Sequence, residues 1–73
     1  MASDPELQLR LGMRCRKLRL RSGLSLMDVV KNNEISLSHL QKIERGVLDA
    51  RLSTLNKLAA AYGVSVSTLL RNV

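Results

Sequence analysis

The chain has 73 residues, with twelve Lys or Arg against six Asp or Glu, which gives a formal charge of +6. A chain of this length forms a single small domain that buries only about 60% of the surface its unfolded form exposes. One cysteine (Cys15) and one histidine (His39) exclude an internal disulfide and the usual clusters of metal ligands. We therefore expect no metal and no cofactor.

The basic excess predicts an anionic partner, either nucleic acid or an acidic membrane surface. Alternatively, a charge of this size serves only the solubility of a small domain. No apolar run approaches the ~20 residues needed to span a bilayer, and the N-terminus lacks the apolar core of a secretion signal. We expect a soluble, cytoplasmic protein without a membrane partner.

The composition favours an all-α fold. Tyr62 is the only aromatic residue, so the core must be built from aliphatic side chains, and the chain has one proline and four glycines. We expect a compact bundle of five helices that forms one domain over 1–73 and begins with a short tail over 1–5.

The first helix is predicted to start in the sequence Ser-Asp-Pro-Glu, where Ser3 or Asp4 caps it and Pro5 takes the first helical position. It runs to about Ser22 and ends at Gly23. At 100° per residue, its surface divides into three strips. They are a core stripe (Leu7, Leu11, Cys15 and Leu18), a basic ridge (Arg10, Arg14, Lys17 and Arg21) and a second apolar ridge (Leu9, Met13 and Leu20).

The two outer ridges of this helix each have two interpretations. The second apolar ridge is either covered by the C-terminal segment or exposed as a contact for a subunit or partner, since contiguous exposed apolar patches mark interaction sites. The basic ridge is either a solvated face or a contact for phosphate.

Residues 25–46 predict two short helices joined by a tight turn, which is a helix-turn-helix unit. Ser25 opens the first of them with Asp28 three residues on, in a variant of the capping box. Asn32 or Asn33 is the expected turning point, because asparagine tolerates the left-handed conformation. The buried stripe of this helix consists of Leu26, Val29 and Val30.

The second helix of the unit is predicted to start at Ser36 as its cap, to run through Arg45 and to stop at Gly46. Leu40 and Ile43 form its inner side. The outer side presents polar residues within roughly 100°, by the helical count of 100° per residue. They are Ser38, Gln41, Lys42 and Arg45, with Leu37 and His39 on the two flanks.

A connecting loop over 47–52 contains Asp49 and Arg51, and a further helix is predicted from a cap at Ser53 to Gly63. Its core stripe consists of Leu55, Leu58, Ala59 and Tyr62. A last short helix in the segment 65–73 is predicted to start at Ser65 and to reach about Arg71. It carries Val66, Leu69 and Leu70.

The sequence resembles the lambda-repressor-like, Xre-type helix-turn-helix proteins over about residues 9–71. Each matching motif is weak alone, but their order and spacing together are specific. The residues that carry the resemblance are Leu18-Arg19, Gly23-Leu24-Ser25, Ile43-Glu44-Arg45-Gly46, Ser53 with Leu58-Ala59, Gly63-Val64-Ser65 and Leu69-Leu70. The resemblance implies a sequence-specific DNA-binding transcriptional regulator, usually a homodimer and repressor-like, that reads a palindromic operator with residues 37–45.

Physical chemistry agrees with this implication, because a helix fits the major groove of B-DNA and reads base edges there. Lys42 is a donor for guanine, and Leu37 suits a thymine methyl group. The other candidates for base edges are Ser38, His39 and Gln41. The candidates for phosphate are the helix starts at Ser25 and Ser36, together with Arg45 and Arg51.

The resemblance also implies a structural ion pair between Arg19 and Glu44, whose disruption on one side costs about 3 kcal/mol if it is buried. The chain departs from the family pattern on the expected DNA face at Leu26, Glu34 and Leu37. Leu26 replaces a glutamine that braces the DNA backbone, and Glu34 replaces a turn glycine at a cost of roughly 1–2 kcal/mol unless the turn bends elsewhere.

Dimerisation, with two recognition helices about 34 Å apart, is expected to use the last helix or the loop before the fourth. The candidates are Val66, Leu69, Leu70 and Val73, with Leu48 and Leu52 nearby. No small-molecule effector site is evident in the sequence.

Two other functions compete with DNA binding. One is a protein-interaction or antitoxin-like module that keeps the fold with a weakened DNA face. Leu26, Leu37 and the second apolar ridge favour this function. The other is a membrane-surface peptide built on the first helix, which the continued helical patterning opposes. An enzyme is not expected, because no catalytic constellation or phosphate loop is present.

Overall fold

A computed structural model describes residues 4–73, and that part of the chain is all-helical. Its helices are α1 (Pro5–Arg21), α2 (Leu26–Asn33), α3 (Leu37–Glu44), α4 (Leu52–Ala61) and α5 (Val66–Leu69). The prediction of an all-α bundle of five helices is therefore confirmed. The alternative cap at Ser3 and residues 1–3 of the expected tail lie outside the described residues.

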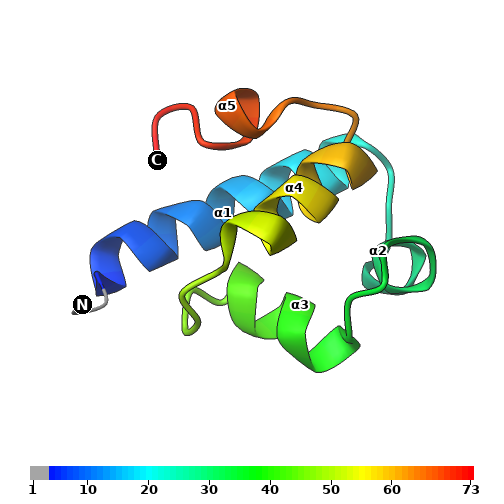
Figure 1. Cartoon of the computed structure of the whole chain (residues 1–73), viewed down its shortest axis with the longest axis horizontal. Helices are drawn as coiled ribbons and strands as arrows, with labels where there is room; N and C mark the ends of the chain where they lie inside the picture. The colour runs from blue at the N-terminus through cyan, green and yellow to red at the C-terminus, as the bar shows by residue number, and fades with distance from the viewer. Residues whose placement is uncertain (1–3) are drawn as a thin grey trace.

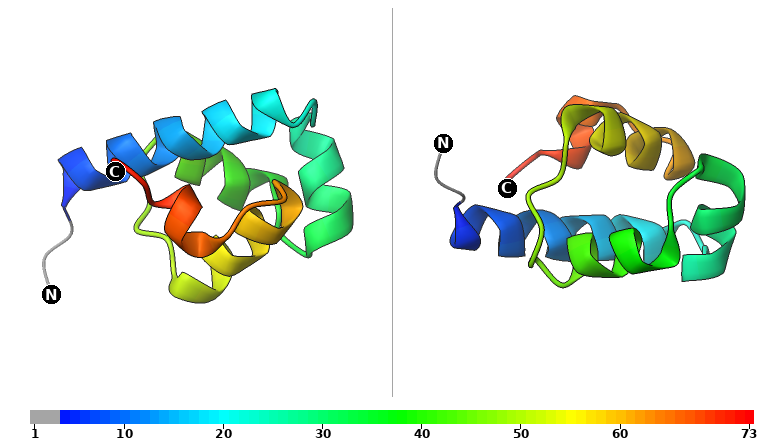
Figure 2. Two further views of the ribbon diagram at one scale, coloured as in Figure 1. Left: turned by 90° about the horizontal axis from the view of Figure 1, so that it is seen from above. Right: turned by 60° about the horizontal axis from the view of Figure 1, so that its bottom comes forward.

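Two pairs of helices pack together, α1 with α3 and α4 with α5. In the view of Figure 1, α5 lies above α1 and α4, and α3 lies below them. α3 packs on α1, α2 joins α3 to α4 at one end, and α5 contacts both α1 and α4. The right view of Figure 2 shows α1 and α3 together on one side of the molecule and α4 and α5 together on the other.

The start of α1 follows its sequence signals. Asp4 caps the helix by accepting a hydrogen bond from the backbone N–H of Leu7 at 3.1 Å, and Pro5 takes the first helical position. The expected core stripe is buried except for Leu7, whose surface is 46% exposed. The prediction for Leu7 is wrong because the first turn of α1 projects beyond the helices that cover the rest of it (Figure 1).

Gly12 lets α1 and α3 lie directly against each other. A Cβ atom at this position would stand 2.5 Å from the carbonyl oxygen of Ile43 and 2.7 Å from that of Glu44. Both oxygens are backbone atoms, which cannot move aside as the end of a flexible side chain could. The absence of a side chain at Gly12 therefore sets the distance between α1 and the C-terminal end of α3.

The turn between α2 and α3 differs from the prediction. Glu34, and neither of the two asparagines, adopts the left-handed conformation, with φ 53° and ψ 44°. Asn32 and Asn33 remain helical, and their side chains donate to the carbonyl oxygens of Asp28 and Val29 at 3.0 and 2.9 Å. The turn thus accepts the roughly 1–2 kcal/mol cost of a left-handed residue other than glycine.

The last two helices also differ from prediction at their ends. α4 begins at Leu52 with Arg51 in the cap position, and no side chain caps it, so the cap expected at Ser53 is wrong. Ser65 does cap α5 by accepting from the N–H of Thr68 at 3.1 Å. α5 ends at Leu69 instead of reaching Arg71, and Asn72 beyond it has φ 62°.

The capping box of α2 gives a prediction on pH. The carboxylate of Asp28 accepts from the backbone N–H of Ser25 at 2.8 Å. Hydrogen bonding with the backbone and with the side chain of Ser25 lowers the pKa of this carboxyl below its ordinary value of 3.8. A pKa that is lower in the folded state stabilises the fold above the unfolded value, and this contribution is lost as the pH falls through the folded value. Asp28→Asn is expected to reduce the loss of stability on acidification below about pH 4.

The measurement is urea unfolding of both proteins in steps from about pH 6 to about pH 2. The wild-type and variant free energies should converge as the pH falls. Curves that stay parallel over the whole range would show that Asp28 does not titrate differently in the folded state.

Candidate nucleic-acid interface

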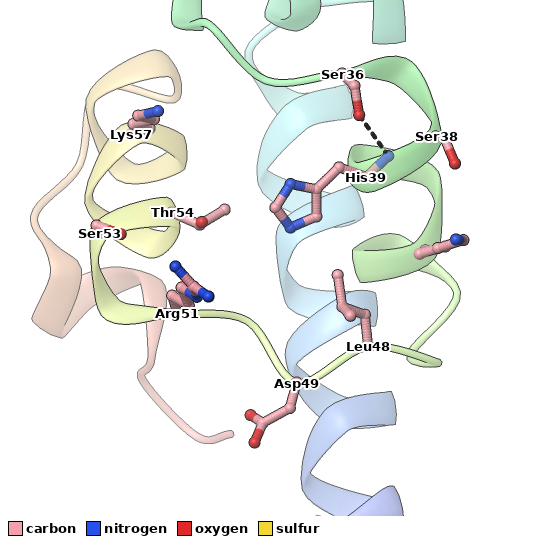
Figure 3. A pocket seen from close by; sticks show the side chains of 10 residues that line it. Ser36, Ser38, His39, Leu48, Asp49, Arg51, Ser53, Thr54 and Lys57 are labelled. Atoms are coloured by element: carbon pink, nitrogen blue, oxygen red, sulfur yellow. Dashed lines mark hydrogen bonds between the residues drawn. The ribbon is translucent and has the colours of Figure 1, made fainter.

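The outer face of α3 is open to solvent, because the inner face of the same helix anchors it. Leu40 and Ile43 are almost entirely buried in the core, which turns Ser38, Gln41 and Lys42 outward as exposed residues. At the start of α3, the hydroxyl of Ser36 accepts from the N–H of His39 at 3.0 Å (Figure 3).

A polar groove of about 570 Å³ separates α3 from the start of α4. Figure 3 shows His39 on the α3 side, and Thr54 and Arg51 on the opposite side. Four of the residues singled out in the sequence besides His39 line this groove: Ser36, Ser38, Lys42 and Arg51. It therefore brings together donors and cations that the sequence places in two separate segments.

Gln41 and Arg45 lie on the other side of α3, in a second groove of about 430 Å³ that also contains Leu26 and Arg16. Ser25 lines neither groove and stands exposed as the cap of α2. The candidate residues of α3 are thus divided between its two flanks instead of forming one cluster.

Three charged residues in these grooves have no role in the sequence-based predictions. Arg16 stands three residues before Arg19 on the same helix, a spacing that could have shown that the two share a side of α1. Lys57 lines the first groove, and its ammonium group lies 3.4 Å from the carbonyl oxygen of Glu34 in the turn. Asp49 is the acidic residue of that groove, and no sequence signal relates Lys57 of α4 to the α2–α3 turn.

Arg19 and Glu44 form a two-bonded ion pair beneath the second groove. Arg19 Nε donates to Glu44 Oε2 at 2.7 Å, and Nη2 donates to Oε1 at 3.0 Å. The two side chains are only 8% and 7% exposed, and the bond to Glu44 raises the pKa of Arg19. Nη1 also donates to the carbonyl oxygen of Leu24 at 3.0 Å, so that one guanidinium group connects α1, α3 and the segment before α2.

Cys15 is a buried thiol of low reactivity. Burial raises the pKa of its thiol to about 12, and the nearby carboxylate of Glu44 acts in the same direction. The thiol is therefore protonated at neutral pH and is neither a nucleophile nor a metal ligand. Among residues 4–73, no three His, Cys, Asp or Glu side chains gather as they would around a metal ion.

Comparisons with known proteins agree with this geometry. Residues 10–71 match the sequence profile of the helix-turn-helix domain family. The chain belongs to this family. It is 40% identical over 65 residues to the HTH-type transcriptional regulator DdrOP3 of Deinococcus deserti, a match that covers 89% of this chain and 50% of that protein. The chain thus spans about half the length of the curated relative it matches.

Two solved structures of the clp gene regulator ClgR from Corynebacterium glutamicum resemble this helix-turn-helix domain. Their TM-scores are 0.85 and 0.84, each at 28% sequence identity. The matches cover 93% and 96% of this chain and 72% and 90% of the two ClgR chains.

The departures from the family pattern have structural explanations in this helix-turn-helix domain. Leu26 is half-buried and packs against the core, where a glutamine would have to bury an amide. Leu37 lies on the first turn of α3 and is 36% exposed. Of these two aliphatic side chains, Leu26 lines the second groove and Leu37 lines neither groove.

The second apolar ridge of the helix-turn-helix domain is exposed. Leu9, Met13 and Leu20 each expose half or more of their surface, and Met13 exposes 71%. The interpretation that the C-terminal segment covers this ridge is wrong. That segment packs elsewhere on α1, where Arg14 Nη2 donates to the carbonyl oxygen of Thr68 at 2.9 Å.

The dimer candidates in the segment 65–73 are not equivalent. Leu69 is entirely buried in the core of the single chain, so its expected role in a subunit contact is wrong. Leu70 is 39% exposed, and Val66 and Val73 are half-buried. α5 packs on both α1 and α4, and Leu69 belongs to the buried core cluster.

No helix within residues 4–73 has the length and apolar character that crossing a membrane requires.

Proposed function

We propose that this domain binds double-stranded DNA as part of a transcriptional regulator, with α3 in the major groove. The observation that carries the proposal is the exposed polar face of α3 on a helix that a buried ion pair and two core residues hold rigidly. Membership of the family and the charge of +6 support it. The relatives are described as a transcriptional regulator and a clp gene regulator, which supports the regulatory role. Neither description names an enzyme.

The proposed roles follow the two flanks of α3. Lys42 donates to guanine, Leu37 contacts a thymine methyl group, and Ser38, His39 and Gln41 bond to base edges. The phosphate contacts are the helix starts at Ser25 and Ser36, together with Arg45 and Arg51. Arg16 and Lys57 join the phosphate contacts because they line the same two grooves.

A homodimer on a palindromic site is the proposed assembly. An apolar hollow between α4 and α5, lined by Leu52, Asn56 and Val66, supports a contact at this end of the molecule. Leu70, Val73 and Leu48 are the further candidates for the subunit contact. Analytical ultracentrifugation of the protein with and without its DNA site tests the assembly. A mass that corresponds to one protein chain, both free and per DNA site, would refute it.

A salt-dependent gel shift against genomic fragments tests the proposal as a whole. Binding should be strongest at low salt and should weaken linearly in a plot of log affinity against log salt concentration, because phosphate contacts release counterions. No shifted band at low salt would refute DNA binding.

Lys42→Ala and Arg45→Ala are expected to have different effects. The lysine variant should lose about 1–3 kcal/mol at one base position and relax the preference there. The arginine variant should weaken binding to all sequences and reduce the salt slope by about 1. Affinities for the best site, for single-base variants of it and for unrelated DNA at several salt concentrations distinguish these outcomes. An equal loss on every sequence for Lys42→Ala would show that Lys42 contacts phosphate.

A protein-interaction or antitoxin-like module is the second candidate function, and the exposed second apolar ridge favours it. Met13→Ser and Leu20→Ser together should leave DNA binding unchanged under the first proposal. Loss of a regulatory effect in cells, with DNA binding intact, would assign the ridge to a protein partner.

A further inference from the structure

A third groove lies between α1 and the C-terminal segment, away from α3 and its two polar grooves. It has a volume of about 360 Å³, and its charged residues are Arg14 and Arg21 on α1 and Arg71 after α5. Leu18 and Tyr62, which are both buried, also line it, and the hydroxyl of Tyr62 has no hydrogen-bond partner. The residues that line it come from α1, from the end of α4 and from the C-terminal segment, and none comes from α3, so this groove does not face a ligand that sits on α3.

The charge of the groove is uncompensated. Three guanidinium groups line it and no carboxylate does. The two ion pairs formed within residues 4–73, Arg10 with Glu6 and Arg19 with Glu44, both use other arginines. Like charges held at this proximity repel one another, so an anion between them would be bound with favourable electrostatic energy.

Arg14 is held in place at the wall of this groove. Its Nη2 donates to the carbonyl oxygen of Thr68 at 2.9 Å, which ties α1 to α5. Its Nε is buried and has no hydrogen-bond partner. A buried donor without an acceptor is unfavourable, so Arg14 keeps an unused hydrogen-bond donor beside this groove.

Size and donor type narrow the class of ligand. A volume of about 360 Å³ lies at the lower end of the range for small-molecule sites, about 300–1,000 Å³. Arginine forks match the oxygen atoms of phosphate and bind them through two parallel hydrogen bonds. The hydroxyl of Ser22 already donates to the carbonyl oxygen of Leu18 at 2.8 Å, whereas the hydroxyl of Tyr62 has no partner and could assist the arginines.

We propose that this groove binds a small ligand that carries a phosphate or diphosphate group, through Arg14, Arg21 and Arg71. Such a ligand joins α1 to Arg71, two residues beyond the end of α5, and so fixes the C-terminal segment on the domain. The residues of the site therefore belong to the helical fold itself. It does not depend on the proposed DNA contacts.

The test uses inorganic pyrophosphate and the full chain in a phosphate-free buffer of constant ionic strength. Calorimetry should show saturable binding, and amide NMR should show shifts at Ser22, Thr68 and Arg71. The double variant Arg21→Gln/Arg71→Gln should weaken the affinity by about tenfold or more, because each lost bidentate contact removes charge-assisted hydrogen bonds. Both side chains are exposed, so that the fold is expected to survive the change.

A charge-matched control removes two positive charges elsewhere, as Lys17→Gln/Lys31→Gln. Both lysines are exposed and neither lines the groove, so this variant should bind pyrophosphate like the wild type. Equal losses in both double variants would show a general attraction of anions and overturn the proposal. Shifts that appear at residues 36–45 instead, or titrations that do not saturate, would overturn it as well.

Discussion

Replacing Glu44 alone by methionine is expected to lower the free energy of unfolding by about 3–5 kcal/mol, because the charge of Arg19 stays buried without its counter-ion. The guanidinium group of Arg19 would keep a single acceptor, the carbonyl oxygen of Leu24. A domain of 73 residues has only about 4–11 kcal/mol of stability in total. The single variant should therefore lose most of its margin and show a much lower urea midpoint.

The double variant Arg19→Met/Glu44→Met distinguishes this cause from simple loss of packing. Replacing a whole buried ion pair by apolar residues of similar volume is often neutral or stabilising. Recovery of most of the lost stability in the double variant would show that the unpaired charge caused the damage. A double variant as unstable as the single one would show that the pair itself, or its geometry, supplies the stability.

Gly12→Ala is expected to destabilise the fold by about 3 kcal/mol, at the upper end of the range for overpacking. Two effects oppose each other here. Alanine in a helix interior is favoured over glycine by about 1 kcal/mol. Against this, the new Cβ atom would stand 2.5 and 2.7 Å from two backbone oxygens of α3, so the helices must separate. Since backbone atoms cannot move aside independently, we expect the clash to prevail.

Arg16→Ala is the matched control, because Arg16 is exposed on the same helix. It should change the free energy of unfolding by no more than about 0.5 kcal/mol, the usual range for surface positions. Urea unfolding of both variants decides the matter. A Gly12→Ala protein more stable than the wild type would show that helix propensity dominates and that α1 and α3 separate at little cost.

The features of the fold that could be predicted from the sequence are those that local chemistry determines. The capping box of Ser25 with Asp28 and the buried pair of Leu40 and Ile43 follow from spacing alone. The sequence-based predictions are wrong where contacts between helices determine burial or backbone conformation. Leu7 matches the core period but has no helix opposite it, and Glu34 takes the left-handed conformation that an asparagine was expected to take.

For the candidate site, the sequence identified residues but not their arrangement. Lys42 and Arg45 are close in the chain, yet they line different grooves on the two flanks of α3. Lys57 and Arg16 enter those grooves from α4 and α1, and periodicity within one helix does not reveal contacts between helices. Gly12 did carry a signal, because a glycine in a helical run costs stability unless a close approach requires it.

The most direct test of the proposed function is a selection from random DNA with the purified chain at low salt. If α3 reads the major groove, the selected pool should converge on one motif, with two half-sites about 10 base pairs apart if the protein binds as a dimer. With Lys42→Ala, the same selection should yield a motif with one relaxed position per half-site. A pool that remains random, from a protein that is folded by circular dichroism, would contradict the proposal that this domain reads DNA.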